Sequence, residues 1–233
     1  MHSGKSLRLR RLFANGRAFL VPLQHGAEDI IGLVRMLARQ DIDGVMLSPG
    51  ILERVEEDLG ALAVVLRLNG ASPRMRQFSS VQGALELGAE AVAFKADAHD
   101  AADLERLGIV TGEARRLGVP VIAEISGEDL LSIVSIAGEY GADAILVHEA
   151  GDNPDLRRAV RTAGRPMLVS MSAGRPAADL LSLAQRHLEA GAQGIVIEST
   201  DEPALMALAG MVHQGVSFEE ALKMAQPEHP NTV

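Results

Sequence analysis

Three polar side chains lie within or at the end of otherwise apolar runs. These are Lys95 in AVAFKADAHD, Glu124 in VPVIAEIS and His148 in ADAILVHEA. A lysine held among apolar walls loses its charge more readily than an exposed one, and as the free amine it can attack a carbonyl carbon. A carboxylate and an imidazole beside it can transfer the protons that imine formation and carbon–carbon cleavage require. We therefore take these three residues as candidates for catalysis.

Lys95 differs from the other lysines of the chain, Lys5 and Lys223, in its position along the sequence. Those two are near the termini, where we expect solvent-exposed charges. An ionised carboxylate in contact with Lys95, from Asp97 or Glu124, would keep the amine charged, as an electrostatic or purely structural group. With the carboxylates farther away, Lys95 would be a nucleophile. The sequence leaves both roles open.

Apolar runs alternate with helical patterns along the whole chain. Near-continuous apolar strands separated by helices indicate a parallel sheet covered by helices. Eight strand–helix units in 233 residues predict an α/β fold, the (β/α)8 TIM barrel, as a single domain over residues 1–233. A doubly wound open sheet is the alternative, but no G-x-G-x-x-G motif follows the first run. The predicted strands are 19–26, 45–49, 63–70, 91–97, 119–126, 142–150, 166–172 and 194–199.

Side chains alternate across a strand, so their parity predicts which of them face the barrel interior. Lys95 and Asp97 share a face with Ala91 and Ala93, whereas the bulkier Phe94 lies on the other face. Barrel enzymes carry their chemistry at the C-terminal ends of the strands. We therefore expect the remaining polar residues at strand ends to bind substrate: Gln24, His25, Arg67, Asn69, Asp97, Ser170 and Glu198.

The two histidines at strand ends also allow less specific interpretations. His25 and His148, with Glu124 or Asp97, could form a two-histidine, one-carboxylate metal site. Their spacing gives no local ligand motif, so we expect neither a metal nor another cofactor. Each histidine could instead be a hydrogen-bonded strand-end residue without a catalytic role. Arg67 could bind an anionic substrate group or only neutralise Glu124.

The composition excludes several classes of protein. Cysteine is absent, which excludes disulfides, thiolate nucleophiles and cysteine-ligated metals and is typical of a cytoplasmic protein. No apolar stretch is long enough to span a membrane, and we expect no signal peptide. The net charge of −9, with one Tyr and no Trp, argues against nucleic-acid binding. The expected partner is a small carbonyl compound.

Several short segments, taken in order, resemble class I aldolases of the archaeal-type fructose-bisphosphate aldolase group, within the deoxyribose-phosphate aldolase superfamily. The segments are LRLRRLFANGRAFLVPLQHG, LRLNGAS, GAEAVAF, GVPVIAE, GADAILVHEAGD, EAGAQGIVIE and MVHQGVSFEEAL. The resemblance spans nearly the whole chain. It implies a TIM barrel, a lysine Schiff base as the reaction intermediate, and an oligomeric protein.

The functional positions implied by this resemblance differ in the present sequence. Gln24 stands where the family has an Asp at the end of the first strand, and Leu146 stands where the family has its Schiff-base lysine. Tyr140, the only tyrosine, does not match the family's assisting Tyr. SMSAG and ESTDEP replace the glycine-rich ends of strands seven and eight that would hold a phosphate, so we expect sugar phosphates to bind poorly. Transaldolase relatives carry the lysine on the fourth strand, which makes Lys95 the expected replacement.

We expect an aldolase-like carbon–carbon lyase acting on a small, sugar-like carbonyl substrate, with Lys95 as the Schiff-base lysine or an electrostatic equivalent. Two alternatives stay open: a lysine-independent isomerase or metal-assisted lyase, and a catalytically silent homologue with a binding or assembly role. The lost family residues favour the silent homologue, whereas the cost of burying unneeded charge disfavours it. The resemblance and the methionines of the C-terminal helices, Met206, Met211 and Met224, predict a homo-oligomer.

Overall fold

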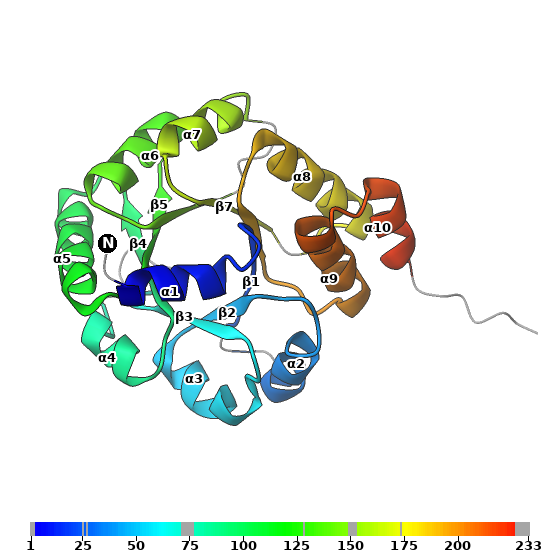
Figure 1. Ribbon diagram of the computed structural model, residues 1–233, viewed down its shortest axis with the longest axis horizontal. Helices are drawn as coiled ribbons and strands as arrows, with labels where there is room; N and C mark the ends of the chain where they lie inside the picture. Colours follow the sequence, from blue (N-terminus) through cyan, green and yellow to red (C-terminus); the bar gives the residue numbers. More distant parts are fainter. Residues whose placement is uncertain are drawn as a thin grey trace, which may run out of the picture.

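The computed structural model describes residues 3–24, 26, 28–70, 77–127, 129–148, 153–172 and 174–226. Its parallel strands close into a barrel in sequential order, with β8 pairing back to β1 (Figure 1). The predicted (β/α)8 TIM barrel is confirmed, and the open doubly wound sheet is excluded. The strands are β1 (Ala18–Pro22), β2 (Gly44–Leu47), β3 (Ala63–Arg67), β4 (Ala91–Asp97), β5 (Val121–Ser126), β6 (Ala144–His148), β7 (Met167–Met171) and β8 (Gly194–Ile197).

Helices form a ring around the barrel, and one further helix, α1, crosses one end of it (Figure 1). Among the described residues, no helix has the length and apolar character needed to cross a membrane. The helices are α1 (Ser3–Leu12), α2 (Ile30–Leu37), α3 (Pro49–Val55), α4 (Val81–Glu86), α5 (Ala101–Leu117), α6 (Leu130–Glu139), α7 (Leu156–Ala163), α8 (Ala177–Ala190), α9 (Glu202–Ala209) and α10 (Phe218–Met224), with a 3-10 turn η1 (Glu56–Asp58) and a π-helical turn η2 (Gly210–Gln214).

The predicted parity of β4 is confirmed. Ala91 and Ala93 are buried in the barrel interior, whereas Val92 and Phe94 pack in the layer between strands and helices. Lys95 follows on the inward face, so its side chain emerges at the C-terminal mouth of the barrel. The side chains of Ala91 and Ala93 are small, so larger side chains from neighbouring strands, such as Ile122, fill the barrel interior beside them.

Several strands end earlier than the apolar runs suggested. β1 ends at Pro22, β3 at Arg67 and β8 at Ile197. Gln24, Asn69 and Glu198 therefore lie in the segments that follow the strands. Their polar side chains are placed by loop conformation as well as by strand parity.

At the N-terminal end of the barrel, one kind of hydrogen bond recurs four times. In each case the side chain just before an even-numbered strand accepts a backbone N–H at the start of the preceding odd-numbered strand. We call these contacts the N-terminal latches. They run from Phe19 to Asp43 (2.6 Å), from Val64 to Glu90 (3.0 Å), from Val121 to Asp143 (3.0 Å) and from Met167 to Gln193 (2.9 Å).

Cations from the terminal segments reach the acidic latch residues. Lys5 Nζ lies 2.7 Å from Asp143 Oδ2, and the Lys5 side chain is 12% exposed. The expectation of a solvent-exposed charge is therefore wrong for Lys5, although Lys223 is exposed as expected. The reason is that α1 folds across the barrel end, inserts Leu12 into the interior and carries Lys5 to Asp143.

Candidate functional site

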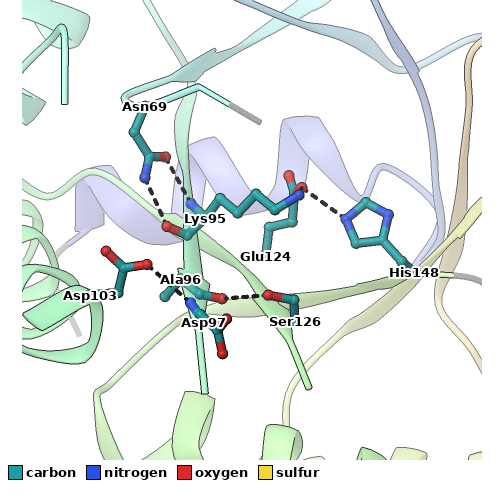
Figure 2. A network of polar contacts seen from close by, with 8 residues as sticks. All are labelled: Asn69, Lys95, Ala96, Asp97, Asp103, Glu124, Ser126 and His148. Atoms are coloured by element: carbon teal, nitrogen blue, oxygen red, sulfur yellow. Dashed lines mark hydrogen bonds and ion pairs between the residues drawn. The ribbon is translucent and has the colours of Figure 1, made fainter. Parts of the chain in front are cut away.

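β4 and β5 place the two central side chains of the site next to each other. Lys95 and Glu124 are register partners in the parallel pairing of these strands. Lys95 Nζ lies 3.4 Å from Glu124 Oε1 (Figure 2). The Glu124 side chain is 7% exposed and the Lys95 side chain 28%. The carboxylate is thus buried, while the amine remains accessible to a ligand.

His148, the last residue of β6, contacts the same carboxylate oxygen. Its Nε2 lies 2.8 Å from Glu124 Oε1 (Figure 2). Because an ionised carboxylate can only accept hydrogen bonds, Nε2 is the donor, and in the neutral ring Nδ1 holds the lone pair. The His148 side chain is 43% exposed. Nδ1 of the neutral ring is the nitrogen that can accept a proton at the barrel mouth.

The pKa of Glu124 reflects opposing effects. Burial raises the pKa, but the hydrogen bond with His148 lowers it, and the charges of Arg67, His148 and Lys95 lower it further. Together they lower the pKa from 4.5 to about 2. Glu124 is therefore an anion at neutral pH, and it forms an ion pair with Lys95.

Asn69 holds the backbone of Lys95 in place. Asn69 Nδ2 donates to the Lys95 carbonyl oxygen (2.8 Å), and the Lys95 N–H donates to Asn69 Oδ1 (2.9 Å). The side-chain amide thereby continues the β3–β4 pairing beyond Arg67 (Figure 2). Because its oxygen and its nitrogen are both engaged, we interpret Asn69 as a residue that positions Lys95.

The Asp97 carboxylate takes no part in the ion pair of Lys95. It accepts the backbone N–H of His99 at 2.9 Å, and Figure 2 shows it directed away from the lysine amine. Of the two carboxylates that parity allowed, the structure thus brings Glu124 to Lys95.

Five consecutive strands each contribute one inward-facing polar residue to the mouth. Arg67 ends β3 and lines a small pocket together with Lys95 and Glu124. Ser170 on β7 is the register partner of His148. The structure therefore assembles Arg67, Lys95, Glu124, His148 and Ser170 into one arc, in the order of their strands.

Gln24 and Glu198 lie on the other side of the mouth, after β1 and β8. Gln24 Nε2 donates to Glu198 Oε2 at 2.5 Å. Both residues line a cavity of about 810 Å³, and the residues lining it do not include Lys95, Glu124 or His148. A second cavity of about 560 Å³ is lined by Gln24 and by Arg67 of the arc. Gln24 thus lines both cavities.

Arg175 is a candidate binding residue that the sequence interpretation missed. It follows β7 as part of Gly174-Arg175 and lines the 810 Å³ cavity together with Glu198 and Asp201. The available signal was a Gly-Arg pair directly after a strand, in the segment that the resemblance assigns to phosphate. Its positive charge offsets one of the two acidic residues, so the expected weak binding of sugar phosphates has less electrostatic support than the sequence suggested.

His25 lies outside the described residues, so the hypothesis of a two-histidine metal site is not tested. Among the residues that the structure does describe, no group of three His, Asp or Glu side chains is arranged to hold a metal ion.

Leu146 is buried in the barrel interior, at the position where the resemblance places the Schiff-base lysine. It is 1% exposed and is the register partner of Glu124. An apolar side chain cannot form an imine. Of the three lysines, Lys5 lies at the opposite end of the barrel and Lys223 on α10, so only Lys95 brings an amine to this mouth.

Two curated relatives are similar over almost their whole length. The 2-amino-3,7-dideoxy-D-threo-hept-6-ulosonate synthase of Halobacterium salinarum is 28% identical, over 96% of this chain and 97% of the relative. The class 1 fructose-bisphosphate aldolase of Thermoproteus tenax is 28% identical, over 92% of this chain and 97% of the relative.

A solved structure of an archaeal fructose 1,6-bisphosphate aldolase is similar with a TM-score of 0.78 at 24% identity, covering 91% of this chain and 100% of that one. That likeness supports the fold. Residues 8–198 match the family described as DeoC/LacD family aldolase. Because this match includes all eight strands, it covers the barrel and every residue of the arc, and the chain belongs to the DeoC/LacD aldolase family.

Proposed function

We propose that this protein is an aldolase-type carbon–carbon lyase that acts on a small carbonyl substrate at the barrel mouth. The observation that carries the proposal is the contact network of Lys95, Glu124 and His148, in which one buried carboxylate holds both a cation and an imidazole. Membership of an aldolase family supports carbon–carbon cleavage as the reaction class.

Lys95 is the proposed partner of the substrate carbonyl oxygen. In aldol cleavage, the electrons of the breaking carbon–carbon bond move to this oxygen and form an enolate. A positively charged group placed in advance stabilises that developing charge more than it stabilises the neutral substrate. The contacts with Glu124 and Asn69 hold Lys95 for this role.

His148 is the proposed proton carrier. Its Nδ1 removes the proton of the β-hydroxyl group as the carbon–carbon bond breaks and an aldehyde forms. The same proton then passes to the enolate carbon, so the reaction balances without an oxidant or reductant. Glu124 stabilises the imidazolium that exists between the two steps through the hydrogen bond at Nε2.

A second route uses Lys95 as a nucleophile that forms an imine with the substrate. The exposure of its amine and the replacement of the usual lysine by Leu146 favour this route. The ion pair with Glu124 opposes it, because the ammonium group must lose its proton before it can attack. We therefore place the imine route second.

The test compares the wild type with Lys95→Met, and with Lys223→Met as a matched control at an exposed lysine. Aldol cleavage of a panel of β-hydroxy aldehydes and ketones is measured, and each mixture is treated with borohydride before intact-mass analysis. We expect Lys95→Met to lose roughly 100-fold or more in kcat/KM, Lys223→Met to match the wild type, and no adduct to form.

The other outcomes separate the alternatives. A borohydride adduct that maps to Lys95 would establish the imine route. Absence of turnover with every carbonyl compound in the wild type would favour a catalytically silent homologue. Turnover that is unchanged in Lys95→Met would leave Lys95 as a structural ion pair and overturn the proposal.

A further inference from the structure

Arg67 is a charged residue of the arc that the proposed reaction does not use. It lies beside Lys95 and Glu124, and its Nε atom is buried. Among the residues that the structure describes, this Nε has no hydrogen-bond partner. Buried N–H donors are almost always paired in folded proteins, so an unpaired one at a cavity indicates an acceptor supplied by a ligand.

The charges around Arg67 do not cancel. Among the described residues that line the small pocket, Arg67 and Lys95 are cations and Glu124 is the one anion, which pairs with Lys95. The guanidinium of Arg67 therefore adds one positive charge that the described members of the arc leave uncompensated. A ligand that carries one negative charge would neutralise the site.

Arg67 also lines the cavity of about 560 Å³ beside β1, β2 and β3. Leu23, Ile51 and Phe78 contribute apolar walls to this cavity, and Ser48 contributes a polar group. The cavity adjoins the small pocket that contains Lys95, because Arg67, Asn69 and Gly70 line both. A ligand bound to Arg67 can therefore reach Lys95 with its next carbon atoms.

We infer that Arg67 binds a carboxylate of the substrate, so that the substrate class is a carbonyl compound that also carries a carboxylate, as a 2-oxo acid does. The inference rests on the proposed function for the carbonyl end alone. A guanidinium group offers Nε and one terminal nitrogen in a planar fork that matches the two oxygens of a carboxylate. With the carboxylate held there, the adjoining carbonyl oxygen faces Lys95 on the neighbouring strand.

A carboxylate fits this cavity better than a phosphate does. A phosphate dianion would leave a net negative charge against a single uncompensated cation. Phosphate sites also use several backbone N–H groups, and two of the residues lining this cavity offer none, because Pro49 has no N–H and the N–H of Ile51 is bonded to the Ser48 carbonyl at 3.1 Å. The apolar walls suit the carbon skeleton of an organic acid.

The test measures binding alone, by calorimetry, with oxamate as a probe that joins a carboxylate to an amide carbonyl. Ethyl oxamate, whose carboxylate is masked as an ester, and inorganic phosphate are the comparison probes. The proteins are the wild type, Arg67→Gln, Arg67→Lys and the matched control Arg54→Gln, which changes an exposed arginine of α3. Thermal melts verify that each variant is folded.

We expect oxamate to bind the wild type and Arg54→Gln alike, and to bind Arg67→Gln about tenfold or more weakly. Arg67→Lys keeps the charge but loses the fork, so its affinity should fall between the two. Ethyl oxamate and phosphate should bind the wild type more weakly than oxamate. Equal oxamate affinity in the wild type and Arg67→Gln, or tighter binding of phosphate, would overturn the inference.

The outcomes also separate this inference from the proposed function. Oxamate binding that depends on Arg67, in a protein without lyase activity, would support the carboxylate site and contradict the proposed lyase function. Cleavage of uncharged carbonyl compounds that depends on Lys95, in a protein that does not bind oxamate, would support the proposed lyase function and contradict the carboxylate site.

Discussion

Glu124 is a buried anion in contact with Lys95 and His148, and its lowered pKa makes the stability of the fold depend on pH. Folding lowers this pKa from 4.5 to about 2, so the ionised side chain stabilises the native state above pH 4.5. That contribution is lost as the pH falls from 4.5 towards 2. At neutral pH it is on the order of 3 kcal/mol.

Comparison of the wild type with Glu124→Gln tests this prediction. We expect the wild type's advantage in the free energy of unfolding to shrink as the pH falls through this window, measured by urea denaturation at each pH. Glu139→Gln, at an exposed position of α6, is the control and should keep a constant difference from the wild type. A pH-independent difference for Glu124→Gln would contradict the prediction.

Sequence parity was sufficient to bring Lys95, Glu124 and His148 to one mouth, because alternation along a strand is fixed by backbone geometry. It could not decide which carboxylate pairs with Lys95. That choice depends on a local competition, since the backbone N–H of His99 takes the Asp97 carboxylate. Arg175 was missed because a loop conformation, which has no simple periodicity, brings it to the cavity.

At the scale of structural elements, the π-helical turn η2 is attached to the barrel by a contact that titrates. It carries His213, whose Nε2 lies 3.1 Å from Asp43 Oδ2 in a largely buried contact. The close contact with Asp43 raises the pKa of His213, whereas burial lowers it. The charges of Asp43 and Asp41 raise this pKa further and Arg17 lowers it, so that the net pKa lies above 6.5. Protonated His213 therefore stabilises the fold below pH 6.5, and this contribution disappears as the pH rises through the higher native pKa.

We expect the thermal unfolding midpoint of the wild type to fall towards that of His213→Gln as the pH rises from about 6 to about 9. Differential scanning calorimetry of the two proteins at several pH values measures this. His99→Gln, which changes an exposed histidine after β4, should show a constant offset. A gap between wild type and His213→Gln that widens at high pH would refute the assigned sign.

The latches illustrate what sequence reasoning at the level of elements could and could not provide. The alternation of apolar runs and helical patterns located every strand, because burial on both faces leaves a strong signal. The role of the side chain just before each even-numbered strand was not visible, since an isolated Asp, Glu or Gln at a strand start is common in loops. The position of α1 beneath the barrel, and with it the ion pair of Lys5, depends on tertiary packing that no local pattern encodes.

For the whole molecule, self-association is the property that the resemblance predicts and that the single chain does not test. Met206 on α9 and Met224 on α10 are 48% and 41% exposed, whereas Met211 is 5% exposed and belongs to the core. The surface argument for an oligomer therefore rests on the first two residues. α9 and α10 pack against each other, and α10 lies outside the ring of helices (Figure 1).

We expect light scattering to give a mass above that of one chain at micromolar concentration, and Met206→Glu to lower it, because a charge within an apolar contact is costly. Ile109→Glu is the control, since Ile109 on α5 is 64% exposed and lies on a different part of the ring. A monomeric mass for the wild type would contradict the prediction. An equal decrease in mass in both variants would show that the effect is not specific to α9.

The N-terminal latches also divide the barrel into pairs of consecutive strands. Each latch joins an odd-numbered strand to the even-numbered strand that follows it, so each lies inside a two-strand unit and none bridges two such units. The barrel is in this sense an assembly of four quarter-barrels. A chain divided at Gly118, between α5 and β5, would leave two latches intact in each half, whereas a division between β5 and β6 would separate Val121 from Asp143. When parts of this protein are exchanged or recombined, the chain is therefore best divided just before an odd-numbered strand.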